Sequence, residues 1–249
     1  MKYSRAPVVR VSVEPRNPAD LPRLLQGLKK LAKFDPTAKI PYEENGQHII
    51  SSCSENHIEL CLNDLQTTYA RCEIKSSDLF AIYRETVTTT SSQVCLAKTP
   101  NRHNKLYVAA EPLSDKLTDL IDSGKLRLND DVKERQKILC GDFGWDASDT
   151  QKIWSFGPDN QGSNTLADVT EGVQYLNEIR DNMNSTFQWV TKEGVLAGEN
   201  LRSVRMNLVD AVMHSDAIHR GAGQIMLTAR RAFFAAELQL NQEYRNQSS

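Results

Sequence analysis

The alternation of strand and helix patterns in residues 1–76 constrains the fold more than any other feature of this sequence. Residues 8–14 (VVRVSVE) alternate branched apolar and polar side chains, the period of a half-buried strand. A leucine stripe over residues 21–31 follows at helical spacing. The preceding Asn17-Pro18-Ala19-Asp20 predicts a helix start, because asparagine caps free N–H groups, proline suits the first helical position and aspartate opposes the positive end of the helix dipole.

A hairpin, a second helix and a closing strand complete this pattern. Asn45-Gly46 is typical of a tight turn, and we expect short strands on both sides of it. Apolar side chains at helical spacing predict an amphipathic helix over residues 57–65, followed by a strand over residues 72–75. The order strand, helix, strand, strand, helix, strand is the split βαβ pattern of ferredoxin-like domains. We therefore expect an α+β, ferredoxin-like domain over residues 1–76.

A second α+β domain is expected over residues 77–238, after a boundary at Ser76-Ser77-Asp78. The residue patterns predict strands over residues 81–87, 105–109, 166–170 and 204–212. They predict helices over residues 113–123, 130–140, 172–193 and 224–238. A tail is expected over residues 239–249, and its last nine residues, NQEYRNQSS, are polar and predict disorder.

The composition is that of a packed protein without a membrane segment. Apolar residues make up 39% and charged residues 25% of the chain, and no apolar run approaches the ~20 residues that span a bilayer. The five cysteines form no C-x-x-C motif and the N-terminus lacks the apolar core of a secretion signal. We therefore expect reduced, buried thiols and a cytoplasmic location. Because the net charge is −2, contact with a nucleic acid would need a local basic patch.

Two polar loops in the second domain hold most of the residues that suit binding. The cations of the loop at residues 98–105 are Lys98, Arg102, His103 and Lys105. Those of the loop at residues 214–224 (HSDAIHRGAGQ) are His214, His219 and Arg220. Both loops follow or precede predicted strands, so they can lie side by side at one pole of the domain. Such cations meet phosphates, while glycine backbone and planar imidazole or guanidinium groups reach the base edges and sugar hydroxyls of RNA. On composition alone, a solvated basic surface explains the same residues.

The same loops leave a metal-dependent enzyme open as an alternative. His103, His214, Asp216 and His219 are residue types that bind zinc or iron, but His103 must come from a distant loop and no further ligand is evident. The sequence has no G-x-x-x-x-G-K-[S/T], which argues against a P-loop nucleotide hydrolase. A Cys–His nucleophile has no supporting motif either. We expect neither a catalytic residue nor a bound cofactor or metal in this chain itself.

Ten motifs follow one another in a specific order along nearly the whole chain. They are VVRVSVE, NPADLPRLLQGLKKLAK, ENGQHII, IYRETV, TPNRHNKLY, WSFGPD, GVQYLNEIRD, TKEGVL, ENLRSVR and DAIHRGAGQI. In this order they resemble elongation factor 2, the translocation factor of eukaryotic and archaeal ribosomes. The resemblance implies that residues 1–76 correspond to the third domain of that family, which is ferredoxin-like. Residues 77–238 correspond to its fourth domain, which resembles the second domain of ribosomal protein S5.

The resemblance also implies roles for the loop residues. His219 matches the histidine that the family converts to diphthamide. The residues expected to contact the ribosome are those of the two loops, namely Asn101, Arg102, His103, His214, Asp216, Ile218 and Arg220. In the family this region enters the decoding site and supports the pairing of codon and anticodon while messenger and transfer RNAs move.

The partners and cofactors implied by the resemblance follow from that role. They are the ribosome with its ribosomal RNA, the transfer and messenger RNAs in the decoding site, and the enzymes of diphthamide synthesis. GTP and magnesium are expected in a first domain outside this sequence. We expect a monomer that supplies geometry and contacts rather than chemistry.

One departure from the family pattern bears on the loop. The family has three glycines after the His-Arg pair, and the middle one is Ala222 here. If that position needs a positive φ, the methyl group costs about 1 kcal/mol and displaces the loop.

The chain is expected to be a piece of a longer factor or a truncated, divergent copy. A stand-alone ribosome- or RNA-binding protein without GTPase activity is the alternative from a different class, beside the metal-dependent enzyme.

Overall fold

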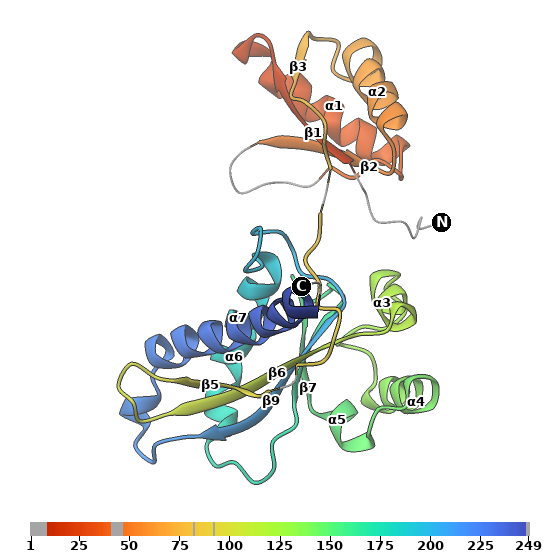
Figure 1. Cartoon of the computed structure of the whole chain (residues 1–249). Coiled ribbons are helices and arrows are strands. Elements are labelled where there is room, and N and C mark those ends of the chain that lie inside the picture. Colours follow the sequence, from red (N-terminus) through yellow and green to blue (C-terminus); the bar gives the residue numbers. More distant parts are fainter. Residues whose placement is uncertain (1–8, 41–46, 82, 92, 248–249) are drawn as a thin grey trace. The chain divides into compact units, whose positions relative to one another are not determined.

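The chain folds around two sheets that belong to two separate units, Met1–Tyr83 and Arg84–Ser249 (Figure 1). A computed structural model describes residues 9–40, 47–81, 83–91 and 93–247, with side chains described as far as residue 239. Each unit combines helices with a sheet, which confirms the expected α+β class.

The first sheet is centred on β1 (Val9–Pro15), the strand predicted from the alternating pattern. β2 (His48–Ser52) and β3 (Ile74–Ser76) flank β1 and run antiparallel to it. β4 (Phe80–Ala81) also pairs with β1, at Val9 and Arg10. The first unit therefore extends beyond the predicted end at residue 76, because the chain returns once more to the central strand.

Two helices cover the face of this sheet that carries Val11 and Val13. A short 3₁₀ turn (Pro18–Asp20) leads into α1 (Leu21–Phe34), and the Asn17 side chain accepts the N–H of Ala19 at 3.2 Å, as expected for the cap. α2 (Glu55–Asp64) continues into a π-helical turn (Leu65–Tyr69). The core between helices and sheet consists of Val11, Val13, Leu24, Leu28, Leu31, Ala38, Ile50, Ile58, Cys61, Leu65 and Ala70.

The hairpin predicted at Asn45-Gly46 lies outside the described residues. On its near side, Lys39 forms an isolated bridge with Ser51 instead of a full strand, whereas the strand on its far side is β2. The prediction of a strand over residues 81–87 is wrong. Ala81 belongs to β4, and Glu85 forms a single bridge with Leu201. The Glu85 carboxylate accepts backbone N–H groups of residues 196, 197 and 199, so this segment anchors a loop rather than extending a sheet.

The second sheet has the strand order β5-β6-β9-β8-β7 among the described residues. The strands are β5 (Cys95–Lys98), β6 (Lys105–Pro112), β7 (Ile153–Gly157), β8 (Asn164–Asp168) and β9 (Val204–Val212). β8 and β9 are parallel and the other neighbours are antiparallel. The expected strands near residues 105–109, 166–170 and 204–212 are thus confirmed.

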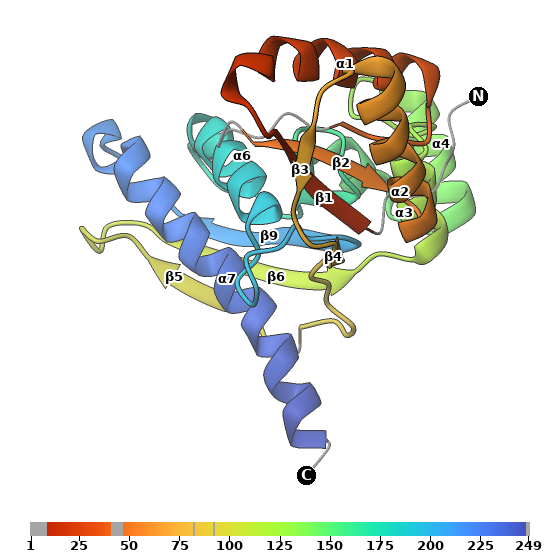
Figure 2. The ribbon, with the colours of Figure 1, turned by 90° about the horizontal axis from the view of Figure 1, so that it is seen from above.

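Helices pack on both faces of this sheet. α6 (Leu176–Lys192) and α7 (Ala222–Gln247) lie side by side across one face (Figure 2) and bury Met183, Phe187 and Phe233 against it. α3 (Asp115–Asp122), α4 (Val132–Phe143) and α5 (Ala147–Gln151) belong to the other side, where a separate cluster includes Leu117, Leu139, Ile153 and Phe156. Every residue of β7 and β8 is buried, as expected for strands covered on both faces.

α7 continues to Gln247 and so runs into the segment for which a polar, disordered tail was expected. An established helix needs no apolar face to add further turns, and glutamine, glutamate and arginine, which recur in this segment, are good helix formers.

Two glycines in helices provide a matched test of the packing. A Cβ on Gly27 in α1 would come within 2.7 Å of the Cβ of Ala70, whereas a Cβ on Gly141 in α4 would meet nothing within 4 Å. We predict that Gly27→Ala lowers the free energy of unfolding of the first unit by about 1–3 kcal/mol, because the methyl group overpacks the helix contact. Gly141→Ala should raise that of the second unit by about 0.5–1 kcal/mol, because alanine favours the helix. Urea unfolding followed by circular dichroism, with hydrogen exchange to separate the units, measures both; stabilisation by Gly27→Ala would contradict this packing.

Glu237 on α7 makes the stability of the second unit depend on pH. It is 3% exposed, and burial, together with the negative charge of Glu85, raises the pKa of its carboxyl from 4.5 to about 8. Because the folded pKa lies above the unfolded one, the contribution to stability is complete below pH 4.5 and is lost as the pH rises through about 8.

We therefore predict that the free energy of unfolding of the second unit falls between about pH 5 and about pH 9, by at most about 1.4 kcal/mol per unit of pKa shift. Glu237→Gln should remove this fall and should be more stable than the wild type at the alkaline end. Denaturant titrations at several pH values measure the difference, and parallel pH curves for the two proteins would refute it.

Candidate functional site

The two polar loops of the second unit lie at the same end of its sheet. β6 and β9 are antiparallel neighbours, and Lys105 at the start of β6 pairs with Val212 at the end of β9. The segment before β6 and the segment after β9 therefore meet, as Figure 1 shows beside the start of α7. We call these two segments, residues 99–104 and 213–221, the tip.

The side-chain amide of Asn104 joins the two segments of the tip. Asn104 is fully buried. Its Oδ1 accepts the N–H of His214 at 2.9 Å, and its Nδ2 donates to the carbonyl oxygen of His219 at 2.8 Å. Because an unsatisfied buried amide costs about 1–3 kcal/mol, these bonds hold the second segment against the first.

Asn101 adds a second set of bonds between the same segments. Its Nδ2 donates to the His219 carbonyl at 3.0 Å, and its backbone N–H donates to Gln224 Oε1 at 3.1 Å. Within the first segment, Thr99 Oγ1 donates to Asn101 Oδ1 at 2.5 Å. The His219 carbonyl thus accepts two side-chain amides, which fixes the backbone of this residue.

Three imidazole rings gather beside these bonds. The ring centroids of His103 and His219 are 4.4 Å apart, those of His214 and His219 are 4.6 Å apart, and those of His103 and His214 are 4.9 Å apart. His214 Nδ1 accepts the N–H of Asp216 at 3.0 Å, so a neutral His214 carries its proton on Nε2. Within the described part of the chain, neither ring nitrogen of His219 has a hydrogen-bond partner. The tip therefore restrains His219 through its backbone and leaves its ring nitrogens unused.

Arg220 does not lie on the surface as predicted. It is 6% exposed, and its guanidinium donates to Glu178 Oε2 through Nε at 3.1 Å and through Nη2 at 2.5 Å. Its Nη1 donates to the carbonyl of His214, and its Cζ lies 4.2 Å from the ring centroid of Tyr175. Arg220 is therefore a structural support of the tip rather than one of its exposed cations.

The outer surface of the tip is formed by other predicted residues. Asp216 caps a 3₁₀ helix (Ala217–Arg220) by accepting the N–H of Ile218 at 3.2 Å, and Ile218 is 77% exposed. On the first segment, Arg102 and His103 are exposed. Arg102 has a φ of 61° and ends a turn in which its N–H donates to the carbonyl oxygen of Thr99. One apolar residue and two basic residues are thus presented to solvent at this end.

The backbone around the glycines is helical or extended. α7 begins at Ala222, which is not among the residues with positive φ, and Gly221 has a φ of −57°. The strain considered for alanine at residue 222 therefore does not arise. A Cβ on Gly221 or Gly223 would meet nothing within 4 Å in the described chain. Neither glycine is required by the packing of the chain itself, and both leave the backbone bare at the start of α7.

Comparison with protein families assigns both units. Residues 5–75 match the model for domain III of elongation factor G, and residues 125–240 match the model for its domain IV. The chain carries domains III and IV of the elongation factor G family. It thus belongs with translation elongation factors that act as translocases.

The match to domain IV covers only one of the two segments of the tip. The segment of residues 213–221 and the start of α7 lie inside the match to domain IV, whereas residues 99–104 precede residue 125, where that match begins. The structure nevertheless places both segments in the same unit and joins them through Asn101 and Asn104. The β5–β6 segment is therefore a structural part of the domain IV unit.

The candidate metal ligands of the tip do not converge. Among the described residues, the group of three or more histidine, cysteine or acidic side chains with converging ligand atoms is Asp35, His57 and Cys61 in domain III. Residues 103, 214, 216 and 219 are not such a group, and His214 Nδ1 is already engaged by Asp216. The geometry therefore does not support the metal-dependent enzyme. In the part of the chain that is described, no helix is both long enough and apolar enough to cross a bilayer.

Four residues that support the tip are not predicted from the sequence: Asn104, Gln224, Glu178 and Tyr175. Asn104 looks like any polar loop residue, and Gln224 like an ordinary residue in the first turn of a helix. Glu178 and Tyr175 lie more than 40 positions before Arg220 in the chain. Their roles depend on contacts between distant segments, for which the local sequence contains no signal.

A charge-matched pair of variants tests the support by Arg220. We predict that Arg220→Ala lowers the free energy of unfolding of domain IV by about 1–3 kcal/mol and speeds hydrogen exchange in residues 213–221, because it removes the ion pair, the bond to the His214 carbonyl and the packing on Tyr175. Arg102→Ala removes the same charge from an exposed position and should change the stability by less than about 0.5 kcal/mol. Chemical denaturation and hydrogen-exchange mass spectrometry measure both effects. Equal effects of the two substitutions would show that charge, rather than support, is what matters.

Proposed function

We propose that the chain works in GTP-dependent ribosomal translocation, as the hinge and lever of a factor of the elongation factor 2 type found in eukaryotes and archaea. Domain III relays changes from a separate GTP- and magnesium-binding module, and domain IV carries the tip into the decoding site. The chain contributes geometry and contacts to this process, while GTP hydrolysis occurs elsewhere in the factor. The proposed location is the cytoplasm and the proposed state is a monomer.

The observation that carries this proposal is the way His219 is held. Two amides fix its carbonyl, while its ring nitrogens have no hydrogen-bond partner in the described chain. The ring packs against those of His103 and His214, and its nitrogens remain for an external partner. This arrangement supports conversion of His219 to diphthamide by the enzymes of diphthamide synthesis.

The outer surface of the tip suits RNA. Arg102 offers a cation for phosphates, His103 offers a planar ring, and the bare backbone at Gly221 and Gly223 allows close approach. Because the whole chain has a net charge of −2, the contact with ribosomal RNA and with the paired transfer and messenger RNAs is local. Such a contact recognises shape and single-stranded or minor-groove features more than a base sequence.

The topology of each unit supports the finer fold assignment. In domain III, β1 lies between β2 and β3 in the sheet. On the other side of β2, Lys39 takes the place of a further strand through a single bridge to Ser51. That is the strand order of a ferredoxin-like sheet with one strand reduced to a bridge. In domain IV, the parallel strands β8 and β9 are connected through α6, and we assign this unit to the fold of the second domain of ribosomal protein S5.

A histidine pair tests the division of labour between this tip and the GTP-binding module. In a full-length factor containing this chain, we predict that His219→Ala impairs maintenance of the reading frame. The rate of ribosome-stimulated GTP hydrolysis should stay within about twofold of the wild type, which corresponds to a change of about 0.4 kcal/mol or less in the activation free energy. His48→Ala, in domain III, is the matched control and should change neither quantity. Reading-frame reporters and GTPase assays measure the two activities, and a parallel loss of both with His219→Ala would contradict the proposal.

The modification can be measured directly in protein from its source cells. Trypsin releases the peptide from Met206 to Arg220, which contains both His214 and His219. We expect the mass of diphthamide on His219 alone, with His214 as the internal control. Two unmodified histidines would refute the modification. Salt-dependent ribosome binding by such an unmodified chain, without stimulation of GTP hydrolysis, would instead identify a stand-alone ribosome-binding protein.

A further inference from the structure

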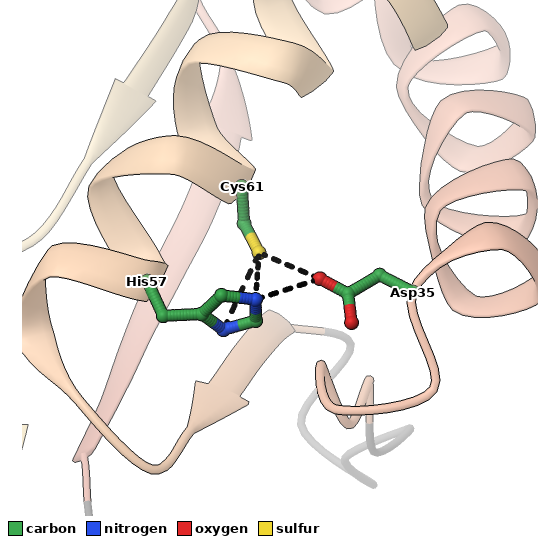
Figure 3. A group of neighbouring side chains, drawn as sticks. All are labelled: Asp35, His57 and Cys61. Carbon is green, nitrogen blue, oxygen red and sulfur yellow. Dashed lines mark hydrogen bonds and ion pairs between the residues drawn. The ribbon is translucent and has the colours of Figure 1, made fainter.

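A cluster of three different metal-binding residue types lies in domain III. Asp35 directly follows α1, and His57 and Cys61 stand one helical turn apart on α2. Figure 3 shows their side chains pointing toward one another. Asp35 Oδ2, Cys61 Sγ and a ring nitrogen of His57 all lie within 4.8 Å of one another. The proposed role of the tip makes no use of these residues.

The Asp35 carboxylate is oriented by its own loop. Its Oδ1 accepts the N–H of Thr37 at 2.9 Å, the hydroxyl of Thr37 at 2.5 Å and the N–H of Ala38 at 3.3 Å. Its Oδ2 faces the other members of the cluster, 2.8 Å from His57 Nε2 and 3.6 Å from Cys61 Sγ. One oxygen is thus occupied by the loop and the other is presented as a monodentate ligand.

Ser52 orients the imidazole of His57 from the opposite side. Ser52 is 1% exposed, and its Oγ lies 2.5 Å from His57 Nδ1. A serine hydroxyl can donate or accept, so it can also accept a proton carried on Nδ1 and leave the lone pair of Nε2 directed at the cluster. Histidine ligands of metals are commonly held in this way through their second nitrogen.

The Cys61 thiol is unsuited to act as a nucleophile. Its Sγ lies 3.9 and 4.0 Å from the two ring nitrogens of His57, against the ring rather than in line with one nitrogen. Burial, followed by the charge of Asp35, raises the pKa of the thiol to about 12. A bound cation would reverse this, because a coordinating thiol loses its proton to solvent.

We propose that Asp35, His57 and Cys61 bind a zinc ion, with water as the fourth ligand. The combination of thiolate, imidazole and carboxylate suits Zn²⁺ rather than Mg²⁺ or Ca²⁺. The side chains of His57 and Asp35 are 28% and 25% exposed, so water and the ion can reach the cluster. The ion links the end of α1 to α2.

The separations of the ligand atoms are near those of a tetrahedral site, but Sγ lies against the imidazole ring and not along the direction of the Nε2 lone pair, so the His57 ring must turn for one ion to bind both atoms. Zinc–ligand bond lengths require about 3.4 Å between nitrogen and oxygen and about 3.6 Å from sulfur to either. The oxygen–sulfur distance of 3.6 Å meets this, and the sulfur–Nε2 distance is 4.0 Å. Nε2 and Oδ2, 2.8 Å apart, must separate by about half an ångström, as expected when an ion replaces the proton between them.

Cobalt as a spectroscopic probe of the whole 249-residue chain, with reduced thiols, tests the site. The expected result is equimolar Co²⁺ binding with a thiolate-to-cobalt charge-transfer band and the intense visible bands of tetrahedral cobalt, both removed by Zn²⁺. Cys61→Ser should abolish the thiolate band, and His57→Gln should weaken zinc binding at least about tenfold. Ser52→Ala should weaken it by about 10–100-fold, because it removes the partner of Nδ1.

The matched thiol control is Cys140→Ser, on α4 in domain IV, which should bind both metals like the wild type. Metal held by the clustered imidazoles of the tip would give no thiolate band, so that outcome overturns the proposal. Zinc binding by Cys61→Ser as tight as that of the wild type also overturns it. If Cys61→Ser does not fold, the wild-type cobalt spectrum decides alone, since a missing thiolate band is sufficient to reject the site.

Discussion

The pairing of β6 with β9 is the constraint on which the tip depends. The two strands are antiparallel neighbours in the sheet, with Lys105 opposite Val212, so the chain enters β6 and leaves β9 at one edge. Asn104, the residue just before β6, is thereby brought to the backbone of both His214 and His219. A register shift of two residues would move it by about 7 Å and break both bonds. The position of His219 is thus fixed by strand register, although the residue itself lies outside any strand.

Local periodicity predicts most of this fold because most of its elements have one apolar face. The strand over residues 204–212 is found in the structure with the same bounds, and the leucine stripe predicts α1. The predicted strand over residues 81–87 fails because a distant contact overrides the pattern. Glu85 sits in a segment that reads as a strand, yet its carboxylate accepts N–H groups more than 100 positions away. The polar end of α7 is helical because its residues favour a helix, which an argument from apolar faces overlooks.

The candidate site is predictable in its location but not in the roles of its residues. Sequence indicates that two basic loops belong together, and the structure joins them. The sequence cannot indicate that Arg220 turns inward. Its guanidinium bonds to Glu178 on α6 and packs on Tyr175 in the segment before α6, and both residues are distant from Arg220 in the chain. Charge is a property of a residue, whereas exposure depends on its partners. A basic residue in a polar loop is therefore a candidate for binding only until a carboxylate or an aromatic face is found within reach.

The histidines of the two domains illustrate how the surroundings of one side-chain type decide its use. Both ring nitrogens of His57 are engaged, Nε2 by Asp35 and Nδ1 by Ser52, so the ring has a fixed direction and suits a ligand that must hold an ion. His219 is held through its carbonyl and through ring contacts with His103 and His214, while its ring nitrogens accept or donate no hydrogen bond among the described residues and suit a contact with an external partner. Hydrogen bonds to its ring nitrogens restrict an imidazole to one role. When only the backbone carbonyl of the histidine is hydrogen-bonded, the ring nitrogens remain available to bind an external partner. The number of residues in a histidine cluster therefore says less about function than which atoms of each histidine the protein has already used.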